Sequence, residues 1–496
     1  MSRGLGGDAH LLFSVAQMYD ADEGAMVSGI PGIQLMTAAG TAVADEIRRH
    51  YVPQETLVLC GPGNNGGDGF VVATSLARSG WPVRVALLGA RESLRGDAAE
   101  AAGAWTGAIE PLDPQAIRGA TLIVDAIFGA GLARAVDGQV LATLQAVAAS
   151  AAHVVAIDIP SGIQGDSGAV MGMALRAERT VTFAPKKAGH CLLPGRRYCG
   201  TVRAVSIGTP ESVIAGIGAV AWENHPDLWL AGFPRADAEG NKYSRGYAIV
   251  VSGSAETTGA ARLAARAALR MGAGLVGVAC PPDALPILAA SLTSVMTKTV
   301  NDTAELRAFA DDRRRPAALI GPGCGITQET REKTLALLSL GKRTVIDADA
   351  LTVFADQPDA LFGQLNEWCV LTPHDGEFAL LFPDLRGSRL DRARAAAARC
   401  GAVVLLKGGD TVVAEPGGRA TVATNAPPYL ATAGAGDVLA GFVLGLISQG
   451  MPAFDAASAA VWLHGDAAAR FGPGLIADDI TESLPGSLLA LEIYIK

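Results

Sequence analysis

Short runs of apolar, β-branched residues alternate along the chain with alanine-rich stretches of helical periodicity. Runs of about four to eight such residues, bounded by Gly, Pro or Asp, predict strands, and their alternation with helices predicts parallel sheets. In the first half we expect strands at TLVLC (56–60), VRVALL (83–88), TLIVDAIF (121–128), HVVAIDI (153–159) and RTVTF (179–183). Ligands of open α/β sheets bind beyond the carboxyl ends of the strands, so the loops that follow these runs are the candidate sites.

The alternation breaks at residues 221–246, AWENHPDLWLAGFPRADAEGNKYSRG, where proline, charges and two tryptophans gather. It then resumes, with strands expected at 247–253, 275–280, 317–323, 343–351, 369–373 and 402–409. A hairpin with its turn at Pro416-Gly417-Gly418 follows, and an apolar helix over 437–450 is the last long element expected. We predict two α/β domains, residues 1–222 and 246–496, joined by a linker at 223–245.

Composition narrows the possible partners. The 496 residues are 50% hydrophobic and 18% charged, which suits two or more buried cores. A net charge of -9 argues against nucleic acid or an anionic membrane as partner, and no apolar run is long enough to predict a membrane span. Seven scattered cysteines without a C-x-x-C motif suit a reducing compartment. We expect a cytoplasmic protein that acts on small molecules and assembles as a homo-oligomer.

The first predicted strand is followed by GPGNNGGDGF (61–70), whose glycines fit the G-x-G-x-x-G loop of a nicotinamide-dependent dehydrogenase. That fold also needs a carboxylate at the end of the second strand, where this chain has GARES. Arg91 in GARES would suit a ribose phosphate, so a dehydrogenase remains an alternative. The loop also carries Asn64, Asn65 and Asp68, which either shape turns or contact a ligand.

Two further strand ends carry polar side chains. Asp125 lies inside the apolar run TLIVDAIF, and Asp158 ends HVVAIDI shortly before Ser161. A buried carboxylate is costly unless it is paired, hydrogen-bonded or bound to a cation, and no Lys or Arg lies within five residues of Asp125. The oxygens of Asn65, Asp125 and Ser161 suit a cation, and a single strong charge among them favours a large monovalent ion over Mg²⁺. Asp158 is then free to meet an organic ligand.

Four motifs in order, VLCGPGNNGGDGFVVA, VDAIFGAGL, AIDIPSGIQGDSG and TVTFAPKKAGH, resemble the NAD(P)H-hydrate epimerase family over roughly residues 12–215. The resemblance implies a Rossmann-like three-layer sandwich and K⁺ on Asn65, Asp125 and Ser161. It implies contacts to the hydrated nicotinamide nucleotide from Asn64, Asn65, Gly66, Gly67, Asp68, Gly129, Ala130, Gly131, Leu132, Ala133, Arg134, Ala135 and Asp158. Thr37 stands where the family usually has an acid. Lys186 and Lys187 match a family P-K element and are either a phosphate contact or a solvated pair.

The second predicted domain has a glycine-rich helix start at ATAGAGDVLAGF (431–442). Backbone N–H groups at a helix N-terminus attract anions, and Gly434 and Gly436 allow a phosphate to approach closely. Asp437 is either the helix N-cap or a base for phosphoryl transfer. The motifs KGGDT (407–411) and VLTPHDGEF (370–378) add a lysine, a histidine and a glutamate at strand ends.

The segments TGAARLAARAALRMGAGLV, IGPGCGI, VIDADAL, LTPHDGEF, LLKGGDTVVA and LATAGAGDVLAG look like the ADP-dependent NAD(P)H-hydrate dehydratases of the ribokinase superfamily, over roughly 235–490. The resemblance implies a ribokinase-like α/β domain, Mg²⁺, and ADP as phosphoryl donor. It implies ADP contacts at Lys407, Gly408, Gly409, Asp410, Thr411 and Gly436, and hydrate contacts at Ala260, Gly323, His374 and Asp437. Asp375 stands where the family usually has proline, and Ala435 where it has threonine.

Both resemblances point to NADH or NADPH hydrated at C6 of the nicotinamide ring. We expect Asp437 to deprotonate the C6 hydroxyl for phosphorylation by ADP, with AMP and phosphate as by-products. Asp158 is the expected acid/base of an epimerase that interconverts the R and S forms. Two alternatives stay open besides the dehydrogenase: a ribokinase-type enzyme with a stable phosphorylated product, and a non-enzymatic binding role for the first domain.

Overall fold

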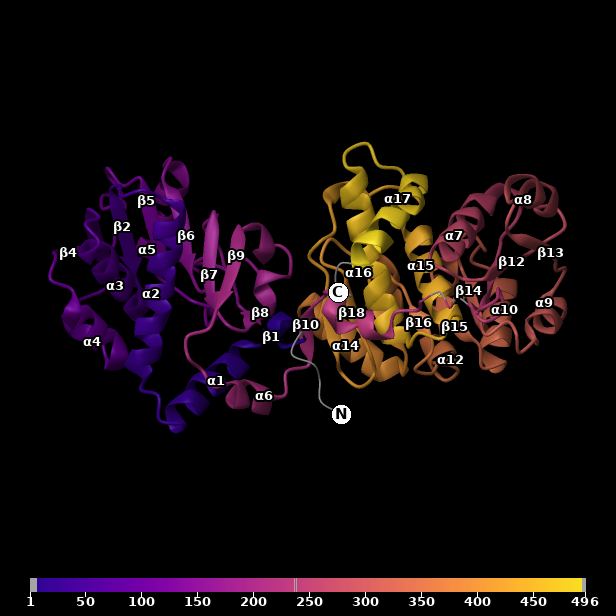
Figure 1. The fold of residues 1–496 in the computed structure, drawn as a ribbon, viewed down its shortest axis with the longest axis horizontal. Helices are drawn as coiled ribbons and strands as arrows, with labels where there is room; N and C mark the ends of the chain where they lie inside the picture. The colour runs from indigo at the N-terminus through magenta and orange to yellow at the C-terminus, as the bar shows by residue number, and fades with distance from the viewer. Residues whose placement is uncertain (1–6, 236, 238, 493–496) are drawn as a thin grey trace. The chain divides into compact units, whose positions relative to one another are not determined.

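The computed structural model describes residues 7–235, 237 and 239–492. Within them the chain forms two compact units, which are coloured indigo to magenta and magenta to yellow in Figure 1. The N-terminal unit comprises residues 8–221, and the C-terminal unit begins at residue 222. Among the described residues, no helix has both the length and the apolar character needed to span a membrane.

The N-terminal unit is built on a parallel sheet with the strand order β4-β3-β2-β5-β6-β7-β9. Its strands are β2 (Thr56–Cys60), β3 (Val83–Leu87), β4 (Ile109–Pro111), β5 (Leu122–Ala126), β6 (His153–Ile157), β7 (Arg179–Phe183) and β9 (Thr201–Val205). All five predicted strands are present, and β4 and β9 were not predicted. Two short strands, β1 (Leu11–Phe13) and β8 (Lys186–Lys187), pair in parallel outside this sheet.

Alternate strand residues point to opposite faces, which gives this sheet two apolar layers. Val58 and Cys60 join a cluster with residues of α2 (Gly32–His50), α3 (Asn64–Arg78) and α4 (Gly96–Ala104). Leu57 and Leu59 join a second cluster with α5 (Gly138–Ala149). The predicted three-layer sandwich is therefore confirmed. The remaining helices of the unit are α1 (Val15–Val27) and α6 (Glu211–Ile217).

The C-terminal unit has the strand order β13-β12-β11-β14-β15-β16-β17-β18-β19-β10. Pairing is parallel from β13 to β17 and antiparallel through β18 and β19, as expected for the hairpin at Pro416. The strands are β10 (Ala221–Glu223), β11 (Tyr247–Val251), β12 (Leu275–Cys280), β13 (Met296–Thr299), β14 (Ala317–Ile320), β15 (Arg343–Ile346), β16 (Val370–Leu371), β17 (Val403–Leu406), β18 (Val412–Ala414) and β19 (Ala420–Val422).

Helices cover this second sheet, and the buried α15 packs on α7 through glycines. A Cβ at Gly441 would lie 2.4 Å from the Ala264 carbonyl oxygen, so small residues permit the close crossing. The expected helix at 437–450 is α15, but it is not the last long element, because α16 and α17 follow it. The helices are α7 (Thr258–Arg270), α8 (Leu285–Ser291), α9 (Thr303–Ala310), α10 (Gln328–Ser339), α11 (Asp349–Thr352), α12 (Pro358–Phe362), α13 (Asp375–Leu381), α14 (Arg389–Cys400), α15 (Ala435–Ser448), α16 (Ala453–Phe471) and α17 (Ala477–Leu491).

The predicted linker, 223–245, is packed on the C-terminal unit at its start. Trp229 is 2% exposed, and its indole N–H donates to Asn224 Oδ1 at 3.1 Å. Its ring also meets Trp462 of α16 with the ring centroids 6.1 Å apart. The apolar surface of this tryptophan, which the sequence placed in a linker, is thus part of the core. Positions 236 and 238 of the segment lie outside the described residues.

The glycines of the first loop serve mainly to pack the start of α3 against the sheet. A Cβ at Gly66 would lie 1.9 Å from the Gly61 carbonyl oxygen, and one at Gly61 would lie 1.9 Å from that of Ile127. Both neighbours are backbone atoms that cannot rotate away. The G-x-G-x-x-G spacing therefore has a steric cause at these two positions, independent of any dinucleotide.

Replacing Gly66 by Ala should destabilise the N-terminal unit, although Gly→Ala within a helix ordinarily gains up to about 1 kcal/mol. The backbone clash should cost about 1–3 kcal/mol, which equilibrium unfolding in urea would measure. Gly103→Ala in α4 is the matched control, because nothing lies within 4 Å of the added Cβ. The steric account fails if both variants are stabilised equally.

Candidate functional site

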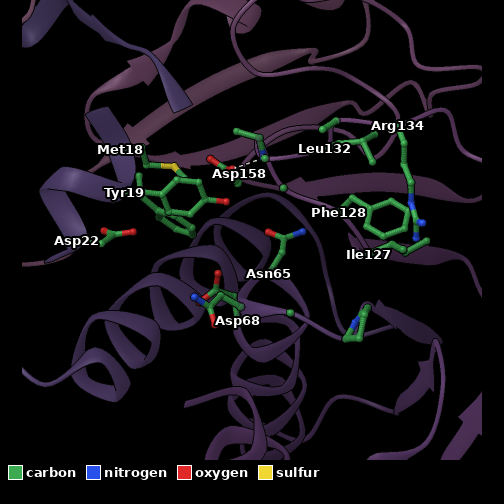
Figure 2. Close-up of a pocket in the computed structure, with 18 residues that line it drawn as sticks. Met18, Tyr19, Asp22, Asn65, Asp68, Ile127, Phe128, Leu132, Arg134 and Asp158 are labelled. Carbon is green, nitrogen blue, oxygen red and sulfur yellow. Dashed lines mark hydrogen bonds between the residues drawn. The ribbon is translucent and has the colours of Figure 1, made fainter. Parts of the chain in front are cut away.

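A cavity of about 530 Å³ opens at the carboxyl ends of the strands of the N-terminal unit (Figure 2). Predicted site residues supply much of its wall: Asn64, Asn65, Asp68, Gly129, Ala130, Gly131, Leu132, Ala133, Arg134 and Asp158. Gly66, Gly67 and Ala135, which were also expected to contact the nucleotide, do not line it. The two glycines are instead buried under the loop, where Gly67 faces Met36.

Asp158 adopts a backbone conformation that few residues other than glycine accept. Its φ is 63°, in the left-handed region, at the turn that follows β6. Three donors hold its carboxylate: the Lys187 ammonium at 2.8 Å and the Thr182 hydroxyl at 3.0 Å on Oδ1, and the Ala130 amide at 2.8 Å on Oδ2. The carbonyl oxygen of Asp158 also lies 2.8 Å from His190 Nε2. Backbone strain at a residue whose side chain is fixed by several hydrogen bonds is typical of functional sites.

Lys187 is fully buried beneath the cavity, in an ion pair with Asp158. Burial alone would raise the pKa of Asp158, but the Lys187 ammonium and these hydrogen bonds outweigh it and lower the pKa to about 2. Asp158 is therefore ionised at neutral pH. Neither expectation for Lys187, a phosphate contact or a solvated pair, describes this position.

Asp125 and Ser161 meet at the ends of neighbouring strands, as their sequence positions predict. The hydroxyl of Ser161 donates to Asp125 Oδ1 at 2.6 Å, and its amide donates to Oδ2 at 2.7 Å. Asp125 is fully buried, and burial raises its pKa. The amide oxygen and nitrogen of Asn65 are also buried and have no hydrogen-bond partner among the described residues. A buried carboxylate without a cationic side chain, beside an unpartnered amide, fits a bound cation.

Helix α1 contributes a wall of the cavity that no motif predicted. Met18, Tyr19 and Asp22 line it, and the Tyr19 hydroxyl lies 2.4 Å from the point that a Cβ on Gly131 would occupy. Figure 2 shows the three side chains of α1 facing the loop that holds Asp158. The sequence of α1 carries no glycine-rich or catalytic pattern, so only its docking in the fold reveals this contribution.

The C-terminal unit gathers its predicted residues around the first turn of α15. Gly434 precedes the helix with a φ of 83°, which favours glycine, and Asp437 is the helix's third residue. Lys407 Nζ lies 3.6 Å from the point that a Cβ on Gly436 would occupy. His464 of α16 supports the turn, with Nε2 3.0 Å from the Ala435 carbonyl oxygen. An ammonium and a helix N-terminus thus face the same point, which suits a phosphate.

Three carboxylates surround Lys407 and Asp437. Lys407 Nζ contacts Asp347 Oδ1 at 2.7 Å and Glu377 at 3.8 Å. Burial raises the pKa of Asp437 to about 6; Asp347 and Asp349 add to the rise, and Lys407 opposes it. Ala348, between the two aspartates, has a φ of 48°, which is strained for alanine. Asp347 and Asp349 lie in the segment VIDADAL, but the sequence pattern did not predict them as site residues.

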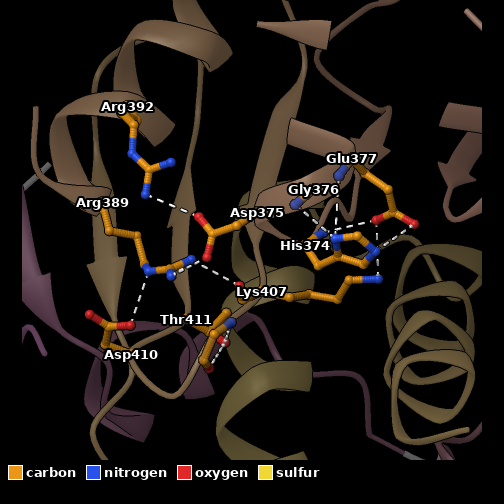
Figure 3. Close-up of polar contacts among 10 residues, drawn as sticks. His374, Asp375, Gly376, Glu377, Arg389, Arg392, Lys407, Asp410 and Thr411 are labelled. Carbon is orange, nitrogen blue, oxygen red and sulfur yellow. Dashed lines mark hydrogen bonds and ion pairs between the residues drawn. The ribbon is translucent and has the colours of Figure 1, made fainter. Parts of the chain in front are cut away.

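The motif around His374 forms the N-terminus of α13. Its Nδ1 accepts hydrogen bonds from the amides of Gly376 at 2.9 Å and Glu377 at 3.3 Å (Figure 3). Because Nδ1 accepts, the ring proton must lie on Nε2, which is directed toward Glu377 at 3.5 Å. His374 is thus both a helix cap and an exposed donor at the site's edge.

Asp375, the departure from the family's usual proline, forms ion pairs with Arg389 at 2.6 Å and Arg392 at 3.1 Å. Arg389 also donates to the Lys407 carbonyl oxygen at 2.9 Å and contacts Asp410 at 3.0 Å. In the same loop, the Thr411 hydroxyl donates to the Gly408 carbonyl at 2.7 Å. The loop of residues 407–411 is therefore rigidly held beside α15.

Gly323 and Ala260 are joined through Thr257, whose hydroxyl donates to the Gly323 carbonyl oxygen at 2.7 Å. Ala260 lies on the first turn of α7, three residues after Thr257, which precedes the helix. Asp349 Oδ2 accepts from the Gly325 amide at 2.8 Å, which ties the same loop to the carboxylate cluster. The predicted substrate residues of this unit thus come from two loops, at Gly323 and His374, and from the first turns of α7 and α15.

Comparison with known proteins assigns each unit. Residues 32–189 match the family described as YjeF-related protein N-terminus, and residues 248–484 match NAD(P)H-hydrate dehydratase. Among solved structures, a ribokinase-like superfamily protein of Enterococcus faecalis is 23% identical, with a TM-score of 0.49, over 54% of this chain and 96% of that one. A Bacillus subtilis ADP/ATP-dependent NAD(P)H-hydrate dehydratase co-crystallised with ATP and Mg²⁺ is 26% identical, with a TM-score of 0.46, over 53% and 96%.

Curated relatives match across both units. The bifunctional NAD(P)H-hydrate repair enzyme of Salinibacter ruber is 38% identical over 92% of this chain and 92% of its own length. Its counterpart in Moorella thermoacetica is 36% identical over 93% of each, and that of Escherichia coli K12 is 33% identical over 93% and 90%. With both family matches in the same order along nearly the whole chain, this protein belongs to the family of bifunctional NAD(P)H-hydrate repair enzymes.

Proposed function

We propose that this chain repairs NADH and NADPH hydrated at C6 of the nicotinamide ring. The C-terminal unit removes water from the S form with ADP as phosphoryl donor, and the N-terminal unit interconverts the R and S forms. The observation that carries this proposal is the placement of Asp437 at the start of α15 beside Lys407, in a chain that shares both units with the repair enzymes. Both units then serve one metabolite.

The chemistry of dehydration explains the need for phosphoryl transfer. Hydroxide leaves C6 poorly, whereas phosphate leaves readily. Asp437 takes the proton of the C6 hydroxyl, and the oxygen attacks the terminal phosphorus of ADP while the bond to AMP breaks. The α15 amides and Lys407 stabilise the charge on the transferred group. The ring nitrogen's electron pair then expels phosphate, and loss of a proton from the neighbouring carbon restores the dihydronicotinamide.

Mg²⁺ fits this unit through two carboxylates at the Lys407 cluster. Asp347 and Glu377 are 1% and 8% exposed, and they share one ammonium between them. Oxygen ligands of this kind suit Mg²⁺, which neutralises phosphate charge when it is bound. Asp375 and Arg389 hold the loop of residues 407–411, so the contacts we propose for ADP, from Lys407 to Thr411 and at Gly436, are preorganised.

The epimerase site uses the cavity of the N-terminal unit. Asp158 is ionised and lines the cavity, so its carboxylate can accept a hydrogen bond from the C6 hydroxyl and then its proton. The start of α3, with Asn64 and Gly63 in the wall, presents a helix N-terminus suited to the pyrophosphate. K⁺ on Asn65, Asp125 and Ser161 would fix the loop that carries Asp158.

Potassium should stabilise the N-terminal unit. At a K⁺ concentration about 100-fold above the dissociation constant, the gain is about 2.7 kcal/mol, and Asp125→Asn should abolish it because the charged ligand is lost. Thermal unfolding in matched K⁺ and Li⁺ buffers measures this without substrate. Asp113→Asn is the control that should keep the K⁺ effect, because this half-buried aspartate accepts a hydrogen bond from Gln115 in its own turn. An unchanged K⁺ shift in Asp125→Asn contradicts the site.

The dehydratase kcat/KM should rise with pH around 6 and level off above it, because Asp437 acts as a base only when ionised. Asp437→Asn should lower the rate by at least about 10²-fold and remove this rise of kcat/KM with pH. The assay follows NADH formation from the pure S form with ADP and Mg²⁺. An unchanged thermal unfolding transition of the C-terminal unit, which carries Asp437, shows that the variant is folded. A rate within about tenfold of wild type would rule out the assignment.

A further inference from the structure

Helix α1 brings into the epimerase cavity a carboxylate that no motif assigns. Asp22 lines the main cavity with Asp68 and Asp158, and it also lines a smaller hollow of about 120 Å³ that shares part of the same wall. Figure 2 shows these three side chains converging from α1, α3 and the turn after β6. The start of α1 is fixed beside the site, because the Val15 amide donates to Asp166 Oδ1 at 2.7 Å.

The three aspartates that line this cavity differ in their partners and in the direction of their pKa shifts. Asp158 has the buried Lys187 ammonium, whereas no described group donates a hydrogen bond to Asp68, which is 8% exposed. Burial raises the pKa of Asp68 well above its usual range, and Asp158 and Asp22 raise it further. Burial also raises the pKa of Asp22; Lys187 opposes that rise, and Asp158 adds to it. Two carboxyl groups with raised pKa therefore line the cavity together with the Asp158–Lys187 pair, and repulsion among grouped carboxylates favours keeping a proton on one of them.

Interconversion at C6 needs both a proton acceptor and a proton donor. The carbon carries a hydroxyl and the ring nitrogen, so the configuration is lost when the C6–N1 bond opens to an aldehyde. The hydroxyl gives up a proton in this step, and the departing nitrogen gains one. Asp158 has a pKa of about 2 and holds no proton at neutral pH, so the donor must be another group.

We propose that Asp22 is the general acid of the epimerase and works across the cavity from Asp158. This proposal rests on the proposed epimerase function. Both Asp22 and Asp68 line the smaller hollow, but Asp22 suits the role better because it is only partly buried, so it can exchange protons with solvent between turnovers. Asp68 is more enclosed, with 8% of its surface exposed.

The step balances without any other reactant. Asp158 accepts the proton of the C6 hydroxyl, the C6–N1 electron pair moves to N1, and Asp22 gives its proton to N1. Rotation about the C5–C6 bond turns the other face of the aldehyde to N1. N1 then attacks C6 as it returns its proton to Asp22, and the proton on Asp158 goes back to the oxygen. The product is the opposite epimer, and both carboxyl groups end in their starting states.

The test is the epimerase rate of Asp22→Asn in the full chain, measured on the pure R form. We expect kcat to fall by at least about 10²-fold while KM changes by less than about threefold, because the side chain keeps its shape but loses its proton. Asp22→Glu should recover part of this loss. In Asp22→Ala, added formate should restore the rate in proportion to its concentration, which a purely structural residue would not allow.

Two controls, and the activity of the wild type itself, distinguish a wrong role for Asp22 from a wrong epimerase function. Asp20→Asn changes an exposed aspartate on the same helix and should leave the rate unchanged. Dehydration of the pure S form by each variant should match wild type. If wild type interconverts the epimers and Asp22→Asn stays within about fivefold of its kcat, the role of Asp22 is overturned and the epimerase function stands. If wild type itself does not interconvert them, the epimerase function fails, and this proposal with it.

Discussion

A lysine–aspartate ion pair at the carboxyl ends of parallel strands, fully buried in the N-terminal unit and partly exposed in the C-terminal unit, is the interaction on which each site depends. Lys187 Nζ lies 2.8 Å from Asp158 in the N-terminal unit, and Lys407 Nζ lies 2.7 Å from Asp347 in the C-terminal unit. In both units the backbone is strained at the aspartate or beside it, with φ values of 63° at Asp158 and 48° at Ala348. Losing one partner of such a pair leaves a buried charge, typically at a cost of about 3–5 kcal/mol.

Each site contains a lysine-paired carboxylate and a second carboxylate with a different pKa. The Lys187 ammonium keeps Asp158 ionised, and in both units a second carboxylate nearby has a raised pKa. Asp437, with a pKa raised to about 6, has this second role beside the Asp347–Lys407 pair. Asp22 stands in the same relation to the Asp158–Lys187 pair. In the proposed mechanisms the two sites use this arrangement differently. Asp437 accepts the proton of the C6 hydroxyl, whereas in the N-terminal unit the lysine-paired Asp158 accepts that proton and Asp22 donates one to N1.

Local sequence patterns predicted the strands and the residues at their ends, because β-branched runs bounded by Gly, Pro or Asp determine both. The contact between Asp125 and Ser161 followed from neighbouring strand ends in this way. Non-local packing could not be predicted: α1 has no motif to show that it reaches the cavity, and Lys187 in sequence resembles any solvated lysine. The alanine-rich α16 and the following α17 were missed, and Trp229 was assigned to a linker although it is core. The residue-level binding roles remain predictions.

The central claim is that two units of one chain act in sequence on one damaged cofactor. The most direct measurement supplies an equal mixture of R and S hydrates with ADP, Mg²⁺ and K⁺, and follows reduced nicotinamide and free phosphate together. The wild type should convert both epimers, with one phosphate released per NADH or NADPH formed. Asp158→Asn should convert only the S epimer, which is half of the mixture, and leave the R epimer. Conversion of the whole mixture by Asp158→Asn at the wild-type rate, or phosphate retained on a stable organic product, would contradict the account.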